Sequence, residues 1–477
     1  MAAAGVLFAP LQLDSYDAGI MAQVGHNLLA SQSVRVTSDP FHLNYPYASY
    51  GIGMSLLMAP AYWVAEHTGR AAVSLIMLIN PLVVALTAVA ILLWGWAASA
   101  TPRQAVVTAL LTVFVTPLLA YTATAFAEPG VALGVATGLL GLQLIRRGRR
   151  TLGCLVAGLG VGIAVLMRPD SLLLVAPILG LAAAALCGRR AMLSAWFLAG
   201  IAPSLLVTGL YNYVRFGSAF VSQYQGMTAG QAFSHPILSG LYGLALSPAR
   251  GLLLYAPIVL LAAVCLPWAW RRSRLMTLTA VCLIAVRILF YAPWYSWEAG
   301  VSWGPRFLVP AMPVLAPLLL EAVRRWPRLP NLGRALFAGL VAVSLAIQVV
   351  GAAEIPGGER LWLAMNRAQI DYGPDFSRFI PVRTSPRTEA IIDGYLFDWQ
   401  YFPIYDSAQQ LLAGRNLAGR YLQPPPHRRA VALLLAAVAA GLLASLLGTR
   451  PGRSDSGPKR LDVGLRRSGR KQKEAGT

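Results

Sequence analysis

The sequence predicts an all-α polytopic membrane protein with about 12 transmembrane helices. Of its 477 residues, 57% are hydrophobic and 12% are charged, whereas soluble domains average roughly 45–50% apolar and about 25% charged residues. The apolar residues fall into blocks of about 17–27, close to the roughly 20 residues that a helix needs to cross the hydrocarbon core. This composition excludes a water-soluble globular protein.

Basic residues separate the apolar blocks. The clusters lie at 146–150, 189–190, 271–274, 324–334 and in the tail after residue 449. The positive-inside rule places each cluster on the cytoplasmic side, and the apolar stretches between them have room for even numbers of spans. The excess of 39 Lys+Arg over 19 Asp+Glu is therefore a topology signal. It needs no nucleic-acid partner to explain it.

The spans follow from this topology. We expect them near 71–98, 104–125 and 129–145, then as pairs that divide at 168–170, 214–250 and 292–304, and again near 335–351. Gly158 and Gly162 form a G-x-x-x-G pair that favours close approach of a neighbouring helix. The 13 apolar residues before Asp14 make only about 20 Å of helix, so we interpret them as the outer part of a first span whose beginning is absent.

Four regions are expected along the chain. Residues 1–351 form the transmembrane module, with a first external loop at about 14–70. Residues 352–428 are polar and rich in aromatics, which indicates an external cap, and 429–448 form the last transmembrane helix. Residues 449–477 are a basic, disordered cytoplasmic tail attracted to anionic lipid.

The first external loop contains the leading candidates for chemistry. Ile20, Val24 and Leu28 recur at helical spacing, which predicts a helix along the outer membrane surface with Asp14 as N-cap and Asp17 in its first turn. Capping explains both acids, but a carboxylate at the hydrocarbon boundary is also well placed as a general base. A second interfacial helix is expected over 51–65.

Aromatic and polar side chains flank these elements. His42, Tyr45 and Tyr47 precede the second interfacial helix, and Trp294, Trp297 and Glu298 lie in a later outer loop. The aromatic rings suit either an interfacial belt or stacking on a sugar ring, and the sequence leaves both readings open.

The order of these features resembles the GT-C superfamily of glycosyltransferases that use lipid-phosphate sugars. In style it is similar to protein mannosyltransferases and lipid A aminoarabinose transferases. The resemblance covers roughly residues 1–320 and includes the short signatures at 14–17 (DSYD), 50–53 (YGIG), 247–255 (SPARGLLLY) and 304–306 (GPR). It implies a GT-C-like fold and a polyprenyl-phosphate sugar as donor.

The resemblance also implies roles for particular residues. An acid of the first external loop would be the base, which matches Asp14 as first choice and Asp17 as second. Ser15 follows Asp14 where the mannosyltransferases have a second acid, so the choice between the two aspartates stays open. Glu128, at an outer helix end, would lie near the active site or be a simple first-turn acid.

A polyprenyl phosphate is a good leaving group, so the enzyme needs a base and cations that hold the phosphate. The candidate cations are Arg250 and Arg306, with Arg168 and Arg215 behind them, although each could also snorkel to lipid headgroups. Arg287 lies inside a span and requires a buried partner, with Glu298 and Glu128 as candidates.

Several chemistries are not supported. The sequence has no dinucleotide-binding fingerprint, P-loop or H-E-x-x-H motif, so a soluble nucleotide-sugar donor is not indicated. Four cysteines, all inside apolar blocks, show no zinc-site or disulfide spacing: Cys154, Cys187, Cys265 and Cys282. No metal site and no cofactor are indicated, though the sequence does not decide a divalent-metal requirement.

The sequence thus predicts a glycosyltransferase of the bacterial plasma (inner) membrane. It would move a sugar from a polyprenyl phosphate to an external glycan, lipid or protein, with inversion at the anomeric carbon. One alternative is a transporter or flippase of a lipid-linked glycan, which would have ionisable residues at mid-membrane. Another is a polysaccharide polymerase or ligase that uses a diphosphate-linked donor.

Overall fold

The computed structural model describes residues 13, 15–37, 46–188, 191–221, 228–300, 302–353, 360–361 and 386–413. The predictions for Asp14, His42 and Tyr45 lie outside the described residues, as do those for the last span at 429–448 and for the basic tail. Within the described ranges the chain is helical, and its β pairing is confined to one isolated antiparallel bridge between Arg35 and Tyr47.

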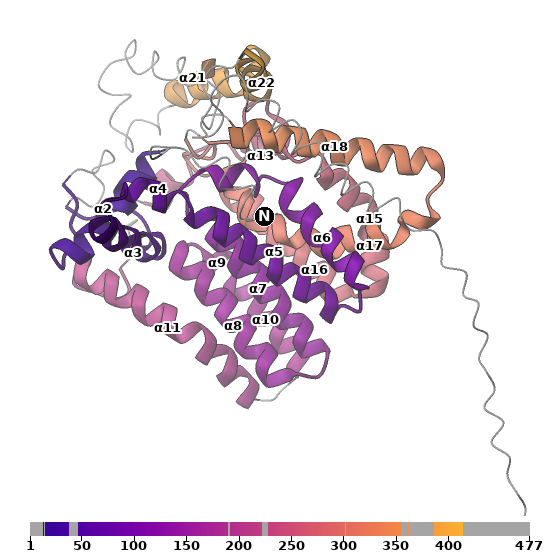
Figure 1. Ribbon diagram of the computed structural model, residues 1–477, viewed down its shortest axis with the longest axis horizontal. Helices are drawn as coiled ribbons and strands as arrows, with labels where there is room; N and C mark the ends of the chain where they lie inside the picture. Colours follow the sequence, from indigo (N-terminus) through magenta and orange to yellow (C-terminus); the bar gives the residue numbers. More distant parts are fainter. Residues whose placement is uncertain are drawn as a thin grey trace, which may run out of the picture.

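Helices build almost the whole described structure (Figure 1). In chain order they are α2 (Tyr16–Ala30), α3 (Ile52–Thr68), α4 (Ala72–Ile76), α5 (Ile79–Ala97), α6 (Pro102–Phe114), η1 (Ala120–Ala123), α7 (Glu128–Arg146), α8 (Arg150–Met167), α9 (Ser171–Leu174), α10 (Ala176–Cys187), α11 (Ala191–Phe216), α12 (Ala229–Ala232), α13 (Ile237–Leu246), α14 (Leu252–Tyr255), α15 (Ile258–Arg272), α16 (Arg274–Tyr291), η2 (Arg306–Leu315), α17 (Ala316–Arg325), η3 (Trp326–Arg328), α18 (Asn331–Ala353), α21 (Pro386–Phe397), η4 (Trp399–Tyr401) and α22 (Pro403–Ala413).

Seven segments of the described chain are long and apolar enough to cross a membrane, which confirms a polytopic membrane protein. They are Ala72–Ala97, Glu128–Arg146, Arg150–Met167, Ser194–Phe216, Arg274–Tyr291, Arg306–Arg328 and Asn331–Ala353. The expected breaks at 168–170, 214–250 and 292–304 all separate helices. The total of about 12 spans stays a prediction.

The outward faces of these helices are apolar, as a lipid environment requires. On α5, Leu82, Leu86, Val89 and Leu93 are all at least 40% exposed and recur every three or four residues. They form one stripe along the helix. In water such a stripe would be a large exposed apolar patch, so it marks the lipid-facing side.

Glycines allow the bundle helices to approach closely. A Cβ at Gly134 of α7 would overlap Gly160 and Ala164 of α8, and a Cβ at Gly158 would overlap the carbonyl of Phe197 on α11. The predicted role of the G-x-x-x-G pair, helix packing, is confirmed. Figure 1 shows α11 running along one edge of this bundle, beside α8.

The span expected at 104–125 is wrong in its second half. Helix α6 ends at Phe114, and the chain then forms buried turns and η1 before α7 begins. Pro117 explains the break, because proline lacks an amide hydrogen and disfavours helical geometry in the residue before it. After these turns the chain reaches Phe126, two positions before Glu128, the first residue of α7.

The two helices expected in the first loop are present as α2 and α3, and their position at the membrane surface stays a prediction. The predicted cap of the first was wrong: the Ser15 hydroxyl, not Asp14, accepts the amide hydrogen of Ala18. Ile20 and Val24 are buried and pack with Ile52 of α3, so this stripe faces the protein rather than lipid.

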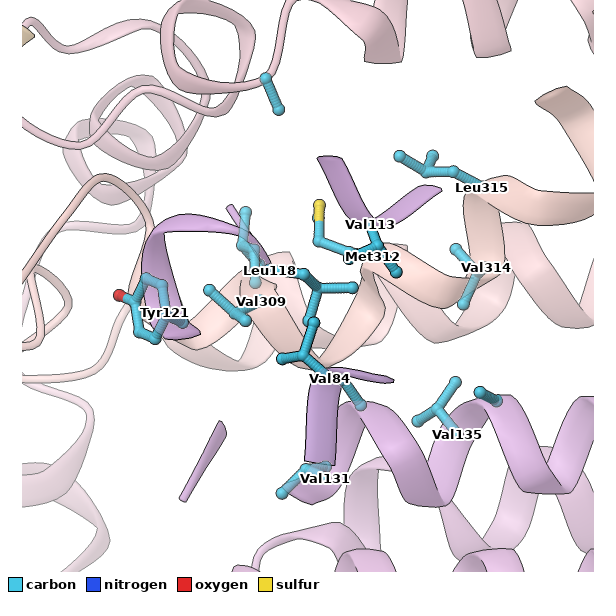
Figure 2. Packing of buried hydrophobic residues seen from close by; sticks show 14 of the residues in the cluster. Val84, Val113, Leu118, Tyr121, Val131, Val135, Val309, Met312, Val314 and Leu315 are labelled. Carbon is cyan, nitrogen blue, oxygen red and sulfur yellow. The ribbon is translucent and has the colours of Figure 1, made fainter. Parts of the chain in front are cut away.

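The segment η2 lies in the middle of the bundle. Pro310 and Pro313 interrupt α-helical hydrogen bonding, and all ten residues of this 3₁₀ segment are buried. Figure 2 shows Val309 and Met312 among side chains from the helices around them. Because η2 is held on all sides, Arg306 at its first residue has a fixed position.

Candidate active site

Three segments far apart in the sequence meet at Arg306. Its Nη2 donates to Asp17 Oδ2 at 2.6 Å, and its Nε donates to Glu128 Oε1 at 2.8 Å. Asp17 comes from the first turn of α2 and Glu128 from the first turn of α7. The guanidinium carbon lies 3.7 Å from the centroid of the Phe126 ring, which adds a cation–π contact. Three residues that the sequence singled out thus form one cluster.

A second arginine extends this cluster. Arg168 Nη1 donates to the same Glu128 oxygen at 2.6 Å, and its Nη2 donates to Asp170 Oδ2 at 3.1 Å. The Tyr291 hydroxyl also donates to Asp170 Oδ2, and the Tyr291 ring stacks on Phe307 with centroids 3.9 Å apart. Glu128 therefore bridges two arginines, each of which holds a further carboxylate. We call Asp17, Glu128, Arg168, Asp170 and Arg306 the outer cluster, after the face to which the topology predicted from the sequence assigns them.

The cluster is buried, and its charges are nearly balanced. The Glu128 side chain is fully buried, and those of Arg306 and Arg168 are 9% and 17% exposed. Burial raises the pKa of the Asp170 carboxyl, but Arg168, Arg287 and the Tyr291 hydroxyl outweigh it and hold that pKa below its usual range. Asp170 is therefore ionised at neutral pH.

Tyr50 fixes the orientation of Asp17. Its hydroxyl donates to Asp17 Oδ1 at 2.7 Å, while Arg306 occupies Oδ2. Tyr50 opens the 50–53 signature, so this motif and the 14–17 motif meet in space. The Asp17 side chain remains 16% exposed.

Arg287 has the buried surroundings that its place in a span required. Its Nη1 donates to the carbonyl oxygen of Phe307 at 3.2 Å, and Asp170 and Glu128 lie within electrostatic reach. The sequence offered Glu298 and Glu128 as partners of Arg287, and Glu128 is a neighbour. Asp170 is a further neighbour that the sequence did not indicate.

A large apolar cavity opens beside the outer cluster. It has a volume of about 1300 Å³ and is lined by α9, α11 and α16 and by the loop before α13. Arg168, Asp170 and Tyr291 line one end of it, and Trp294 and Phe307 lie beside them. Leu206 and Leu210 line the cavity and are exposed, and they belong to α11, one of the segments long and apolar enough to cross a membrane. A long apolar molecule could therefore enter from the bilayer and meet the charged end.

Two candidate cations lie outside this cluster. Arg250 is fully buried and donates to the carbonyl oxygens of Ala249, Glu298 and Gly300 at 2.6–2.9 Å. Its nitrogens hold the outer loop in shape, so we do not retain it as a phosphate ligand. Arg215 donates to the carbonyl of Ala48 at 2.7 Å and joins α11 to the first loop instead.

The aromatic candidates divide in the same way. Trp294 lines the cavity. Trp297 is buried, and its Nε1 donates at 3.3 Å to Asp393 of α21, in the expected cap segment. Glu298 is buried and accepts from Ser296 at 3.2 Å, and Tyr47 contacts Phe216 and Arg35 near the first loop.

Asp170 and Tyr291 belong to the site although the sequence did not single them out, and Tyr50 was singled out only as the first residue of the 50–53 signature. Asp170 lies in the predicted break at 168–170, and Tyr291 directly precedes the predicted break at 292–304. The available signal was the alternation of charge in Arg168-Pro169-Asp170 at an outer helix end. Among the described residues no three His, Cys, Asp or Glu side chains are grouped as metal ligands.

Comparison with solved structures gives the class of fold. The described chain has the polytopic fold of the GT-C glycosyltransferases, as the sequence predicted. The identities are too low to carry more than the fold. No protein-family model and no curated protein matches the sequence.

The similar structures include two kinds of enzyme. The Archaeoglobus fulgidus oligosaccharyltransferase in complex with Zn and sulfate is 15% identical at a TM-score of 0.52, over 80% of this chain and 57% of that one. The same enzyme tethered with an acceptor peptide is 12% identical at 0.51, over 92% and 67%. ArnT from Cupriavidus metallidurans bound to undecaprenyl phosphate is 15% identical over 86% and 76%, and its TM-score of 0.47 adds no weight.

Proposed function

We propose that this protein is an integral-membrane glycosyltransferase that moves a sugar from a polyprenyl phosphate to an acceptor at the external face of a bacterial inner membrane. One observation carries the proposal. An apolar cavity of about 1300 Å³, lined in part by the membrane-spanning helices α11 and α16, has Arg168 in its wall, beside a carboxylate network that includes Asp17.

The cavity favours an amphipathic donor with a long apolar tail. The prenyl chain would lie along α11, against Leu206 and Leu210, and the phosphate would lie at Arg168. The planar fork of arginine suits phosphate oxygens, and Arg168 lines the cavity whereas Arg306 lies behind it. Trp294 at the same end offers a surface for the sugar.

Asp17 is the base that the geometry favours. Its carboxylate would take the proton of an acceptor hydroxyl as that oxygen attacks the anomeric carbon. The bond from this carbon to the phosphate oxygen breaks with inversion, and the polyprenyl phosphate leaves with the electron pair. Arg306 and Tyr50 position Asp17, and Glu128 positions both arginines. Asp14, the first choice from the sequence, lies outside the described residues and stays the other candidate for the base.

A diphosphate-linked donor is the alternative, because the sequence leaves a polysaccharide polymerase or ligase open. A flippase is less favoured, because Glu128, Arg168 and Arg306 all lie at helix ends rather than at mid-span.

The test is release of polyprenyl phosphate by the purified, reconstituted full-length protein. A panel of short-chain polyprenyl-phosphate sugars is supplied with and without membrane extract as acceptor, beside diphosphate-linked donors. Acceptor-dependent release from a monophosphate donor is expected. Release only from diphosphate-linked donors would show that the proposed monophosphate donor is wrong. No release from any donor would contradict the proposed transferase activity.

A matched pair of variants connects the activity to the site. Arg168→Gln removes the cation at the cavity, and Arg150→Gln removes an exposed cation at the other end of the same helix. We expect only the first to abolish release. Equal activity of both variants would contradict the assignment of the phosphate to Arg168.

A further inference from the structure

A second charged region lies at the opposite end of the helix that begins at Glu128. Helix α7 has 19 residues and is about 27 Å long, so its ends lie near opposite membrane faces. At the second end, arginines from three parts of the chain surround two cavities: Arg146, Arg147, Arg271, Arg272, Arg324, Arg325 and Arg328. We call this region the arginine pocket.

The two cavities of the arginine pocket adjoin each other. One has a volume of about 310 Å³ and the other about 460 Å³. Arg272, Glu321 and Arg324 line both of them. A phosphate group with its hydration or headgroup atoms fits within either volume.

The pocket has far more positive than negative charge. Glu321 is the acidic residue in its lining, and it pairs with Arg272 at 3.2 Å, Arg324 at 2.6 Å and Arg325 at 2.9 Å. Arg271 and Arg328 also line the larger cavity, and within the described ranges they have no ion pair or side-chain hydrogen bond. Among the described residues of the pocket, the cations therefore outnumber the anions.

Several of these guanidinium groups are already held in place. Arg324 Nη2 donates to the carbonyl of Ala98 at 3.0 Å, and Arg325 lies 4.5 Å from the Trp268 ring. Topology alone requires only that cations face this side, as the exposed Arg149 and Arg150 do. Fixed cations around a hollow go beyond that requirement, because they are organised before an anion arrives.

We propose that the arginine pocket binds the phosphate group of an anionic phospholipid from the leaflet at this face. Arginine forks are suited to phosphate oxygens, and basic pockets between the ends of membrane helices bind anionic headgroups. Trp268 at the rim is typical of the lipid interface. The inference does not rest on the proposed glycosyltransferase activity.

The experiment measures lipid binding to the delipidated full-length protein by native mass spectrometry. Phosphatidylglycerol, phosphatidylcholine and inorganic phosphate are added separately at 0.15 M salt, where surface charges are screened beyond about 8 Å. We expect retention of phosphatidylglycerol over phosphatidylcholine. Binding of inorganic phosphate without preference for phosphatidylglycerol would overturn the lipid as the source.

Two double variants with the same loss of charge test the location. Arg271→Gln with Arg328→Gln removes unpaired cations of the pocket, and Arg149→Gln with Arg150→Gln removes exposed cations of the same face outside it. The first pair should weaken phosphatidylglycerol binding about tenfold or more, and the second less than about twofold. Equal weakening of phosphatidylglycerol binding by both pairs would mean that general surface charge explains the binding, and it would overturn the proposal. Unchanged melting temperatures show that both variants are folded.

Discussion

The outer cluster and the arginine pocket lie at the two ends of α7 and differ in charge balance. Both contain a buried glutamate that bridges arginines: Glu128 between Arg168 and Arg306, and Glu321 among three arginines. In the outer cluster, carboxylates and guanidinium groups are similar in number. In the arginine pocket, one carboxylate faces seven arginines. The same residue types therefore form two kinds of site.

This difference in balance has a physical consequence. Buried charges are tolerated only when paired and hydrogen-bonded, so a balanced network fixes its members in one geometry. A network with excess cations is incomplete until an anion joins it. We infer that the outer cluster positions reacting groups, whereas the arginine pocket holds a ligand.

The largest expected effect is on the proposed base. Asp17→Asn keeps the shape of the side chain but removes its ability to take a proton, so transfer should fall about 10²–10⁴-fold. The measurement is the release of polyprenyl phosphate under saturating donor. Donor binding should change little, because Arg168 is left intact.

Asp14→Asn is the matched variant, three residues away in the same segment. If Asp17 is the base, Asp14→Asn should retain activity. The reverse result, with Asp14→Asn inactive and Asp17→Asn active, would assign the base to Asp14.

The next largest effect is a loss of stability, which should differ between the two bridging glutamates. Glu128→Gln leaves Arg168 and Arg306 without their shared carboxylate, and breaking a buried ion pair costs about 3–5 kcal/mol. We expect a lower melting temperature and loss of transfer. Glu321→Gln should cost less, because its partners Arg272 and Arg325 are 57% and 28% exposed and retain solvation.

Thermal unfolding in detergent and the release assay measure both variants together. The expected result is that Glu321→Gln keeps transfer activity. Equal destabilisation by the two substitutions would contradict the expectation that the outer cluster depends more strongly on its glutamate than the arginine pocket does.

A smaller effect is expected when only the geometry of a cation changes. Arg168→Lys keeps the charge at the cavity but loses the planar fork, so the KM for the donor should rise about tenfold. Arg150→Lys on the exposed end of the same helix is the control. A KM unchanged by Arg168→Lys would argue that the phosphate lies elsewhere.

The smallest effect concerns pH. The pKa of the Asp170 carboxyl lies below its usual value of about 4, so its ion pairs stabilise the fold above that pH and are lost as the pH falls through the lowered pKa. Asp170→Asn removes this contribution. The decline of melting temperature between about pH 5 and pH 3 should be shallower in the variant, and an unchanged slope would contradict it.

The sequence alone determined the class of protein and much of the site's membership. Hydropathy and the spacing of basic residues are local properties, and they identified the membrane fold and most helix boundaries. Ionisable residues at outer helix ends are unusual in apolar chains, and this rarity identified four members of the site: Asp17, Glu128, Arg168 and Arg306. The break in 104–125 was missed although Pro117 indicates it.

Only the tertiary structure decided which of these residues meet. Asp17 and Arg306 are 289 positions apart, yet their side chains are 2.6 Å from each other, and no local pattern encodes such a contact. Arg250 and Arg306 both lie at the predicted outer start of a span. In the structure Arg250 donates its hydrogen bonds to backbone carbonyls, whereas Arg306 donates to carboxylates. Burial and pairing depend on the packing of distant helices, so the outer cluster and the arginine pocket became distinguishable only in three dimensions.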